Sequence, residues 1–538
     1  MSLTIKNHNS KKLLIILFSL TFFVFLFTSD GHRYTIDEHL SQEMAFKMTT
    51  LVPDPTYVQG ESKNYFHIPL FNPYNVGSLC SNGITCYPIS FFYSITEVPF
   101  IAINHFFSII TPDTLILDTD DFTDQHYVFW RNSEKADLVF LELFYGPVFT
   151  ALSISIFFLI CLEHKFSKRT SITLSLLLAF STMMWAYSGT SLNVVSALFF
   201  VLLGYFFYKK SQSKHELNFL ILSSISFAFA FQIRESSILF VIPIWLLILI
   251  NLFRKKTKIF PSIFFMIPLF FSYFLSKFIE SLRWYADPKE ISAQSIDTPF
   301  VTDIFNFSTT LIPNNFIFFV HMYGLLFAPG LGLFVFSPIL LTIFFAFPDF
   351  FRKNKTECIL LLSFFLIHLV YFANIGDSWH GFISWGPRYL FMIIPFLLIP
   401  LGASLETRNK KFMFVLLITL GLLGIFFNIA YVTQDVSWFV WSHPGGSTGL
   451  YGLGIPNTIC DWTCQALNSD YYINNITIWT FQYSQLTHSI LLMFQTLQQD
   501  IYLLHLIGYN AYFVILLPTT SFLIYLLWRV SRHTFDTN

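Results

Sequence analysis

Long apolar runs recur along nearly the whole chain, and they constrain its fold more than any other feature of the sequence. A helix that crosses the hydrocarbon core of a bilayer needs about 20 predominantly apolar residues, and runs of about that length recur here. Only 12% of the residues are charged, whereas soluble domains carry about 25%. The sequence therefore predicts an all-α polytopic membrane protein with about twelve spanning helices, long outer loops and interfacial helices.

Basic residues occur in clusters that indicate the sidedness of the chain. Short loops rich in Lys and Arg stay in the cytoplasm. Between consecutive clusters the apolar stretches allow one outward and one return helix, so that every cluster falls on one side and both termini lie inside. The clusters lie at residues 11–12, 165–169, 209–214, 254–258, 352–355, 408–411 and 529–532.

The spanning helices are predicted from the apolar stretches between these clusters. The first is interpreted as an uncleaved helix, because no small-x-small cleavage site follows it. The predicted helices are residues 13–27, 138–162, 172–187, 191–208, 217–231, 237–253, 259–279, 331–351, 358–373, 389–405, 412–432 and 503–528.

Three long outer loops follow from this topology. Residues 1–433 form the predicted catalytic core, which includes the loops 29–137 and 280–330. Residues 434–505 form a third outer loop, and 506–538 hold the last helix and a cytoplasmic tail. The apolar stretches 88–110 and 315–328 are predicted as helices in the outer interface, the alternative being a further pair of spanning helices.

Four of the six cysteines lie in these outer loops as two close pairs. Cys80 with Cys86 and Cys460 with Cys464 are predicted disulfides, because close pairs outside the cytoplasm are readily oxidised. Zinc ligation by the second pair is the alternative. Cys161 and Cys358 lie in or near helices and are expected to be free and inert.

The first candidate site is the acidic pair Asp37-Glu38, about ten residues after the first helix at the outer surface. Adjacent carboxylates near a membrane face suit a general base or a metal ligand, and a solvated loop charge is the alternative. A divalent cation is therefore a candidate cofactor. A second acidic outer stretch is more simply a solvated loop, and it contains Asp118, Asp120, Asp121 and Asp124.

The second candidate site is the polar loop before the tenth predicted helix. An arginine at the start of that helix can reach a lipid phosphate with a planar fork of donors, or it can snorkel to headgroups. This arginine lies in one loop with an acidic residue, a histidine and two tryptophans, which favours a binding role over snorkelling. The candidate phosphate-binding residues are Arg388 and His380, and the candidate substrate-binding residues are Asp377, Trp379, Trp385 and Tyr389.

The third candidate site is Arg234-Glu235, in the tight outer turn between the fifth and sixth predicted helices. An adjacent charge pair at that depth is either a structural ion pair or faces a polar cavity beside a phosphate. Both interpretations remain open, and Arg234 joins the candidate phosphate-binding residues.

The order of these candidate sites and the predicted topology resemble the GT-C superfamily of polytopic glycosyltransferases. Its protein-mannosyltransferase and aminoarabinose-transferase branches are the most similar in type. The residues that carry this resemblance are the acidic pair in residues 34–39, the stretch 330–338 and residues 385–390. The resemblance covers about residues 13–405 and concerns order and topology. It implies a catalytic carboxylate in the first outer loop, at Asp37 with Glu38 beside it. Ile36 replaces a small residue that often precedes the family's acidic pair, which leaves the exact base open.

The expected function is transfer of a sugar from a polyprenyl- or dolichyl-phosphate carrier to an extracytoplasmic protein, lipid or glycan, with inversion at the anomeric carbon. Phosphate is a good leaving group, so a base and cationic groups are the main requirements. The expected location is the plasma membrane, among membrane lipids and without a nucleic-acid partner. The alternatives are a transporter or flippase, an acyltransferase with His368 as its histidine, and a non-catalytic scaffold.

Overall fold

The computed structural model describes the helical part of the chain and short pieces of its outer loops. The described residues are 8–31, 38, 41–42, 45, 78–79, 85–86, 90–110, 139–214, 217–254, 260–283, 315–375, 379–381, 384–406, 411–434, 478–482, 484–495 and 499–533. Within these ranges every element is helical except one short antiparallel hairpin, β1 (Ser78–Leu79) with β2 (Thr85–Cys86). The prediction of an all-α polytopic membrane fold is confirmed.

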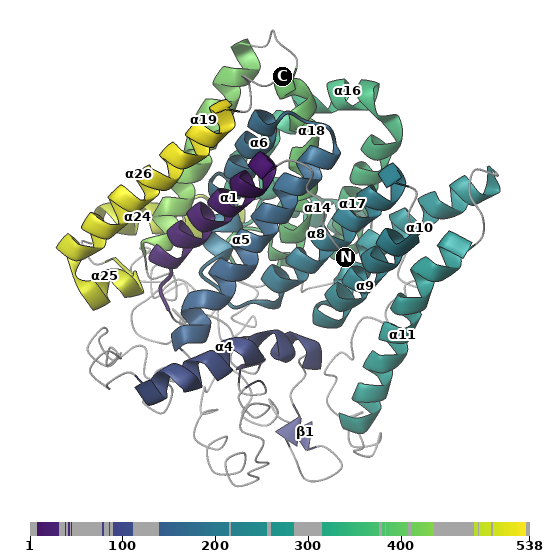
Figure 1. Cartoon of the computed structure of the whole chain (residues 1–538), viewed down its shortest axis with the longest axis horizontal. Helices are drawn as coiled ribbons and strands as arrows, with labels where there is room; N and C mark the ends of the chain where they lie inside the picture. Colours follow the sequence, from purple (N-terminus) through teal and green to yellow (C-terminus); the bar gives the residue numbers. More distant parts are fainter. Residues whose placement is uncertain are drawn as a thin grey trace.

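Most of the helices run lengthwise through one bundle (Figure 1). A bilayer core offers no water to backbone N–H and C=O groups, so helices, which satisfy these groups internally, are the favoured spanning element. The main helices of the bundle are α1 (His8–Phe27), α5 (Val139–Glu163), α6 (Lys168–Phe180), α8 (Asn193–Lys214), α9 (Leu217–Ile233), α10 (Ile238–Phe253), α11 (Phe260–Arg283), α16 (Ile343–Lys353), α17 (Lys355–Ala373), α18 (Ile394–Glu406), α19 (Lys411–Val432) and α26 (Tyr509–His533).

Short elements join or extend the long helices. They are α7 (Met184–Tyr187), η4 (Glu235–Ser237), α15 (Leu333–Phe336), η5 (Pro338–Thr342), η7 (Arg388–Ile393), α24 (Gln485–Gln495) and α25 (Tyr502–Ile507). Helix α24 lies in the third loop, where the sequence predicted no helix. The predicted helix 503–528 is divided into α25 and α26 at Gly508, which has φ +79°. In the described residues nine helices are long and apolar enough to cross a membrane, and they coincide with nine of the twelve predicted spans.

The other three predicted spans are present as shorter or interrupted helices. Helix α9 has 17 residues. The predicted span 172–187 is broken between α6 and α7. Here Gly424 of α19 approaches so closely that a Cβ atom would lie 2.3 Å from the Ser181 carbonyl oxygen. The Asn428 amide donates to the Phe180 carbonyl at 3.4 Å, which satisfies part of the backbone freed by the break.

The predicted span 331–351 is interrupted at Pro338, which begins the 3-10 turn η5. Proline has no backbone N–H and cannot continue the α-helical ladder of α15. The Ser337 hydroxyl accepts a hydrogen bond from the Met183 N–H at 3.1 Å. The two interruptions therefore face each other in the bundle, and sequence periodicity alone had continued a helix through both.

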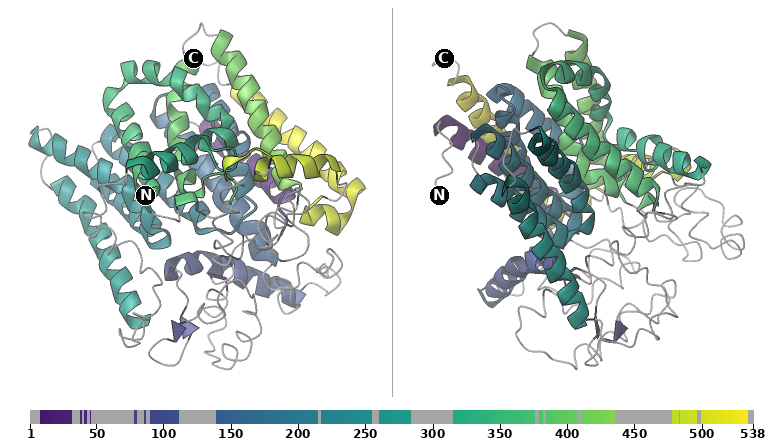
Figure 2. Two further views of the ribbon diagram at one scale, coloured as in Figure 1. Left: turned by 180° about the vertical axis from the view of Figure 1, so that it is seen from behind. Right: turned by 90° about the vertical axis from the view of Figure 1, so that its right-hand side faces the viewer.

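Helix α4 (Phe91–Ile110) lies across one end of the bundle instead of running along it (Figure 1). The two further views show the same arrangement, with α4 lying across the lower end of the bundle and α11 reaching down to its level (Figure 2). Neither α4 nor α14 (Asn315–Phe327), which has 13 residues, is among the candidate membrane spans found in the described residues. This agrees with the predicted interfacial helices and disfavours a further spanning pair.

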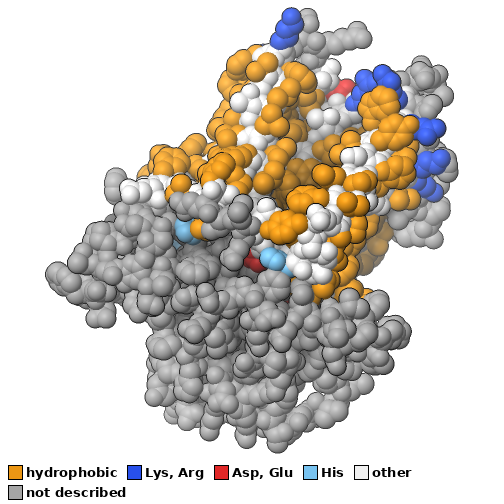
Figure 3. All heavy atoms as spheres, turned by 90° about the vertical axis from the view of Figure 1, so that its left-hand side faces the viewer, with side chains coloured by type: hydrophobic (Ala, Val, Ile, Leu, Met, Phe, Trp, Pro, Cys, Tyr) orange, Lys and Arg blue, Asp and Glu red, His pale blue; other side chains and the backbone are white. Residues whose placement is uncertain are grey.

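The surface of the described residues is apolar over a broad band, and Lys and Arg side chains gather at its upper edge (Figure 3). Helix α16, with Arg352 and Lys353 in its last turn, lies at this same end of the molecule, opposite α4. Helix α1 begins and α26 ends at this end as well (Figure 1). The bundle thus separates a basic end from the end that carries α4.

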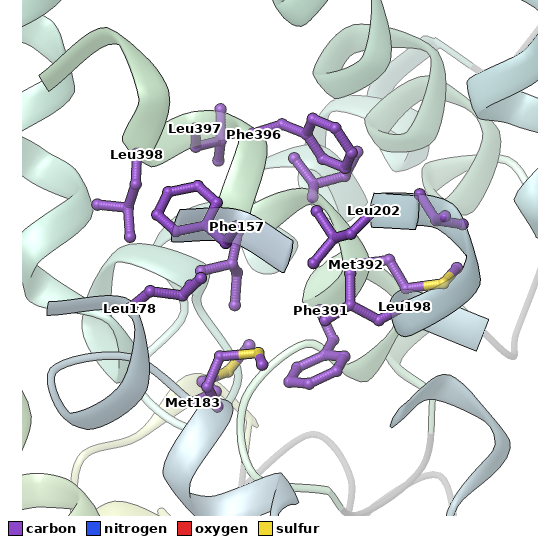
Figure 4. Packing of buried hydrophobic residues seen from close by; sticks show 14 of the residues in the cluster. Phe157, Leu178, Met183, Leu198, Leu202, Phe391, Met392, Phe396, Leu397 and Leu398 are labelled. Carbon is purple, nitrogen blue, oxygen red and sulfur yellow. The ribbon is translucent and has the colours of Figure 1, made fainter. Parts of the chain in front are cut away.

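The centre of the bundle is filled by side chains from α5, α6, α8 and the η7–α18 segment (Figure 4). Packing of this kind, rather than exclusion of water, holds spanning helices together, because lipid tails are as apolar as the side chains. The labelled residues are Phe157, Leu178, Met183, Leu198, Leu202, Phe391, Met392, Phe396, Leu397 and Leu398.

Cys161 and Cys358 are free and buried, as predicted. Cys80, Cys460 and Cys464 lie outside the described residues, so both disulfides stay predictions. We expect two thiols per chain when the denatured, unreduced protein is titrated with a thiol reagent, and six after reduction. Closing such short loops adds about 2 kcal/mol each. Six thiols without reduction would contradict both pairings.

Candidate active site

The loop between α7 and α8, residues 188–192, is the structural centre of the candidate site. Helix α5 packs against it at Gly146, where a Cβ atom would lie 2.3 Å from the Ser188 carbonyl and 2.5 Å from that of Thr190. Only a glycine allows this approach. The loop is thereby held against α5. Ser191 near its end contacts a group of carboxyl side chains, and Asn193, the first residue of α8, contacts an arginine.

Ser191 binds the carboxyl side chains. Its N–H donates to Glu38 Oε1 at 2.9 Å, and its hydroxyl lies 3.4 Å from the same oxygen. The hydroxyl also donates to Glu142 Oε2 of α5 at 3.1 Å. Glu38 is fully buried, so the alternative of a solvated loop charge is wrong for this residue. Asp37 lies outside the described residues.

Two further carboxyl groups lie beside Glu38, one on α5 and one on α4. Glu142 also accepts a hydrogen bond from the Gln42 amide, which donates to the Ser191 hydroxyl as well, at 3.0 Å. Glu97 Oε2 accepts from the Ser41 hydroxyl at 2.7 Å. All three carboxyl groups are buried. The first outer loop is therefore tied to α4, α5 and the 188–192 loop by its residues 38, 41 and 42.

Burial raises the pKa of Glu97 well above its ordinary range, and the neighbouring carboxyl groups of Glu142 and Glu38 raise it further. The Ser41 and Tyr93 hydroxyls lower it, but by less. Like charges held close together in a buried site cannot all ionise. Burial beside two other carboxyl groups therefore favours the protonated form of Glu97.

We expect Glu97→Gln to remove a pH dependence of stability. In the unfolded chain Glu97 ionises near pH 4.3, whereas the folded protein keeps it neutral, so Glu97 lowers the free energy of unfolding as pH rises from about 4.5 toward its raised folded pKa. The glutamine retains the shape and stays neutral. As the pH rises from 4.5 to 8 in detergent, the thermal unfolding temperature of the Glu97→Gln protein should fall less than that of the wild type.

The matched control for this prediction is Glu163→Gln, the same chemical change at a half-exposed position at the end of α5. It should follow the wild-type pH profile. A Glu97→Gln protein that loses more stability at pH 8 than at pH 4.5, relative to wild type, would show that Glu97 is ionised in the folded state.

Asn193, two residues after Ser191, binds the arginine. Its side-chain oxygen accepts from Arg234 Nη1 at 2.9 Å, and Arg234 Nε donates to the Ser236 hydroxyl at 3.1 Å. Arg234 lies in the tight turn between α9 and η4. These two hydrogen bonds fix the direction of the guanidinium group.

Arg388 begins η7, close to the position that the sequence predicted for it. Its guanidinium carbon lies 5.4 Å from the centre of the Tyr389 ring, and that of Arg234 lies 5.7 Å from the same ring. One face of the ring stacks on Phe372 at 4.5 Å. Gly381, in the left-handed region at φ +72°, lies directly against the Arg388 side chain. Two guanidinium groups thus meet around one tyrosine.

Two tyrosines lie near the carboxyl cluster and the arginine pair. Tyr187, at the end of α7, is close enough to both guanidinium groups for their charges to act on its hydroxyl. Tyr431, at the end of α19, is under the influence of Tyr187 together with Glu38 and Asp30. The surroundings of Tyr187 thus include the arginine pair, and those of Tyr431 include Glu38 and Tyr187.

The tryptophans predicted to bind substrate are both buried. Trp385 packs between Phe336 and Tyr431, at 4.8 and 4.3 Å between ring centres. Trp379 stacks on His321 at 4.6 Å. They border the arginine pair, because Trp379 lies two residues before Gly381 and Trp385 three before Arg388. His380 is buried beside Trp379, and Asp377 lies outside the described residues.

Sequence reasoning missed the buried polar residues that organise the site. Glu97 and Glu142 each interrupt an apolar stretch, and an ionisable residue inside such a stretch is by itself a functional signal. The remaining residues carry no such signal, because single serines, asparagines and tyrosines are common in spanning helices. They are Ser41, Gln42, Tyr187, Ser191, Asn193 and Tyr431.

His368, the candidate for an acyltransferase, is a buried helix residue. Its Nδ1 bonds with the Phe364 carbonyl at 2.8 Å, and its ring lies 4.3 Å from that of Phe240. Within the described residues its Nε2 has no hydrogen-bond partner, so no nucleophile is paired with it there. In the same part of the chain no group of three His, Cys, Asp or Glu side chains is arranged to hold a metal ion.

No protein-family model and no curated protein matches the sequence. Among solved structures, ArnT from Cupriavidus metallidurans in the apo state matches 89% of this chain and 76% of its own, with a TM-score of 0.43 and 11% identity. Its complex with undecaprenyl phosphate matches 89% and 77%, with a TM-score of 0.41 and 12% identity. The archaeal oligosaccharyltransferase AglB from Archaeoglobus fulgidus, in complex with an inhibitory peptide and a dolichol-phosphate, matches 81% and 58%, with a TM-score of 0.40 and 12% identity. At 11–12% identity and TM-scores of 0.40–0.43, these are distant similarities.

Proposed function

We propose that this protein is a membrane glycosyltransferase that moves a sugar from a polyprenyl- or dolichyl-phosphate carrier to an extracytoplasmic acceptor. The observation that carries the proposal is the meeting of opposite charges at one loop. Ser191 holds the carboxylate of Glu38, and Asn193 holds the guanidinium of Arg234. Transfer from a lipid phosphate needs a carboxylate base and a cationic phosphate site at a short distance from each other.

The two kinds of group divide the chemistry between them. The guanidinium groups of Arg388 and Arg234 bind the carrier phosphate, which arginine recognises with its fork of N–H donors. The carboxylate of Asp37 accepts the proton of the acceptor hydroxyl as that oxygen attacks the anomeric carbon. The bond between this carbon and the phosphate oxygen breaks, and its electron pair leaves with the phosphate. One displacement inverts the configuration at the anomeric carbon.

Glu38 has a different part in this scheme from Asp37. Its Oε1 accepts from the Ser191 backbone and side chain, so it is a positioning residue that fixes the loop next to Asp37. The neutral Glu97 lowers the total negative charge in the cluster, which favours approach of an anionic carrier. The contacts of Glu38 with Ser191 support Asp37, rather than Glu38, as the base of this pair.

The experiment that tests the function is a comparison of transfer with transport in proteoliposomes. The donor is a polyprenyl phosphate that carries a labelled sugar, and a membrane extract supplies acceptors. We expect label to pass from the lipid to a product that organic solvent no longer extracts. Movement of the intact labelled lipid between leaflets, or of label into the lumen, without such a product would instead support a transporter or flippase.

We also propose that both termini are cytoplasmic and that Asp37, Arg234 and Arg388 lie at the outer face of the plasma membrane. The basic end of the bundle supports this, since Lys and Arg favour cytoplasmic loops. In a variant without native cysteines, Ser378→Cys should react with an impermeant reagent added to whole cells. Lys256→Cys should react only after the membrane is opened. The reverse pattern would invert the topology.

A further inference from the structure

The outer end of α1 is held by the C-terminal part of the chain. The Tyr502 N–H donates to the Ser29 carbonyl at 3.1 Å. The Tyr512 hydroxyl donates to the Phe27 carbonyl at 2.5 Å. These carbonyls belong to the last turn of α1 and the residues after it, where a helix has no backbone partners of its own. From this point α26 packs along α1 toward the basic end of the bundle (Figure 1).

The fit at this contact is tight and depends on a glycine. Gly31 has φ +77°, a conformation that favours glycine, and a Cβ atom there would lie 2.9 Å from Cδ2 of the Tyr502 ring. A small buried cluster continues the contact inward. It consists of Phe27, Ile501, Leu504 and Tyr512. The direction in which the chain leaves α1 is therefore set by α25 and the start of α26.

The C-terminal segment, residues 499–512, also reaches the opposite side of the site. The Asp500 N–H donates to the Thr433 carbonyl at 3.1 Å, two residues after Tyr431 on α19. From the other direction, the Trp185 indole N–H donates to the Thr28 hydroxyl at 2.9 Å. The stretch 27–31, from which the first outer loop departs, is thus fixed between α7 and the C-terminal segment.

We propose that residues 499–512 position the first outer loop for catalysis, so that Gly31, Tyr502 and Tyr512 are positioning residues for the carboxylate base. This inference rests on the proposed function, because it concerns the loop that carries Asp37. Asp37 follows Gly31 by six residues, and Glu38, next to it, is fixed by Ser191. The first outer loop is therefore attached before Asp37, at residues 27–31, and directly after it, at Glu38. A reacting group that is displaced by about 1 Å can lose about 100-fold in rate.

The test uses the full-length protein with Tyr502→Ala, Tyr512→Phe and Gly31→Ala. The matched control is Tyr525→Phe on the same helix, at a hydroxyl on the exposed face. We expect the three variants to lower kcat by about 10- to 100-fold with donor binding unchanged, since none of them contacts Arg234 or Arg388. The control should keep wild-type kcat. Tyr512→Phe removes one hydrogen bond only and keeps the test valid if another variant does not fold.

Hydrogen exchange supplies a readout that does not depend on activity. Amides in a peptide covering residues 27–31 should exchange faster in Tyr512→Phe and Tyr502→Ala than in the wild type or in Tyr525→Phe. Unchanged exchange, or unchanged kcat in an active wild-type background, would overturn the positioning role. A wild-type protein that transfers no sugar but shows the expected exchange would instead refute the proposed function and leave the attachment itself established.

Discussion

Asp37→Asn is expected to reduce sugar transfer by about 100-fold to 10,000-fold, the usual loss when a general base is removed. The amide has the shape of the carboxylate but cannot take the acceptor proton. Binding of a polyprenyl phosphate should be unchanged, because a carboxylate offers no attraction to an anionic phosphate. The measurements are initial rates with a labelled donor and equilibrium binding of a polyprenyl-phosphate analogue to the purified variant.

Glu38→Gln is the informative companion of this variant. The structure predicts a smaller loss, because a glutamine oxygen can still accept from the Ser191 N–H and hold the loop. Ser191→Ala removes the hydroxyl that Glu38 and Glu142 share and should also act on kcat alone. A larger loss in Glu38→Gln than in Asp37→Asn would transfer the role of base to Glu38.

Arg388→Ala is expected to weaken carrier binding as well as turnover. Hydrogen bonds to charged groups contribute about 2 to 3 kcal/mol, so Kd for a polyprenyl-phosphate analogue should rise by about 30- to 150-fold. Arg388→Lys should restore only part of the affinity, since lysine presents a point charge and no fork. Arg254→Ala, at an exposed position directly after the last residue of α10, is the matched control and should bind normally.

Arg234→Ala allows the two arginines to be compared. Both guanidinium groups lie beside the Tyr389 ring, so a shared phosphate predicts that the losses in the single variants do not add in the double variant. Normal binding by Arg388→Ala, together with full activity of Asp37→Asn and Glu38→Gln, would remove the site proposed here. The transporter and scaffold interpretations would then be favoured.

The division between binding and turnover is what distinguishes these variants. Loss at Asp37 concerns a proton that moves only in the transition state, so it lowers the rate without changing the affinity for the donor. Loss at Arg388 concerns a charge that is present on the carrier before, during and after the reaction. Variants of Gly31, Tyr502 and Tyr512 should resemble Asp37→Asn in kind but with a smaller effect, because they displace the base without removing it.

Much of the architecture follows from local sequence. Length and apolarity locate spanning helices, because a bilayer imposes the same requirement on every one of them. Nine predicted spans are present as candidate membrane helices in the described residues, and the interfacial position of α4 follows from Pro99 and Glu97 within an apolar stretch. The positions of Arg234 and Arg388 at helix starts likewise follow from charges that flank apolar runs.

The interruptions of two predicted spans follow from contacts between helices. The break after Phe180 depends on Gly424 and Asn428, which lie far away in sequence on α19. The sequence shows the proline at the second break, Pro338. It does not show that the Met183 N–H donates to the hydroxyl of the neighbouring Ser337. Periodicity within one stretch carries no information about a backbone group that another helix satisfies.

The sequence by itself determined the membrane class, the order of the helices and the charged residues, next to apolar runs, that are candidates for the site. Only the tertiary structure showed that Glu38, Glu97 and Glu142 are buried together, that Ser191 and Asn193 connect them to Arg234, and that Tyr502 and Tyr512 hold the exit from α1. The physical reason is that these contacts join residues far apart in the chain. A serine or tyrosine becomes a positioning residue only through the partner that folding brings to it.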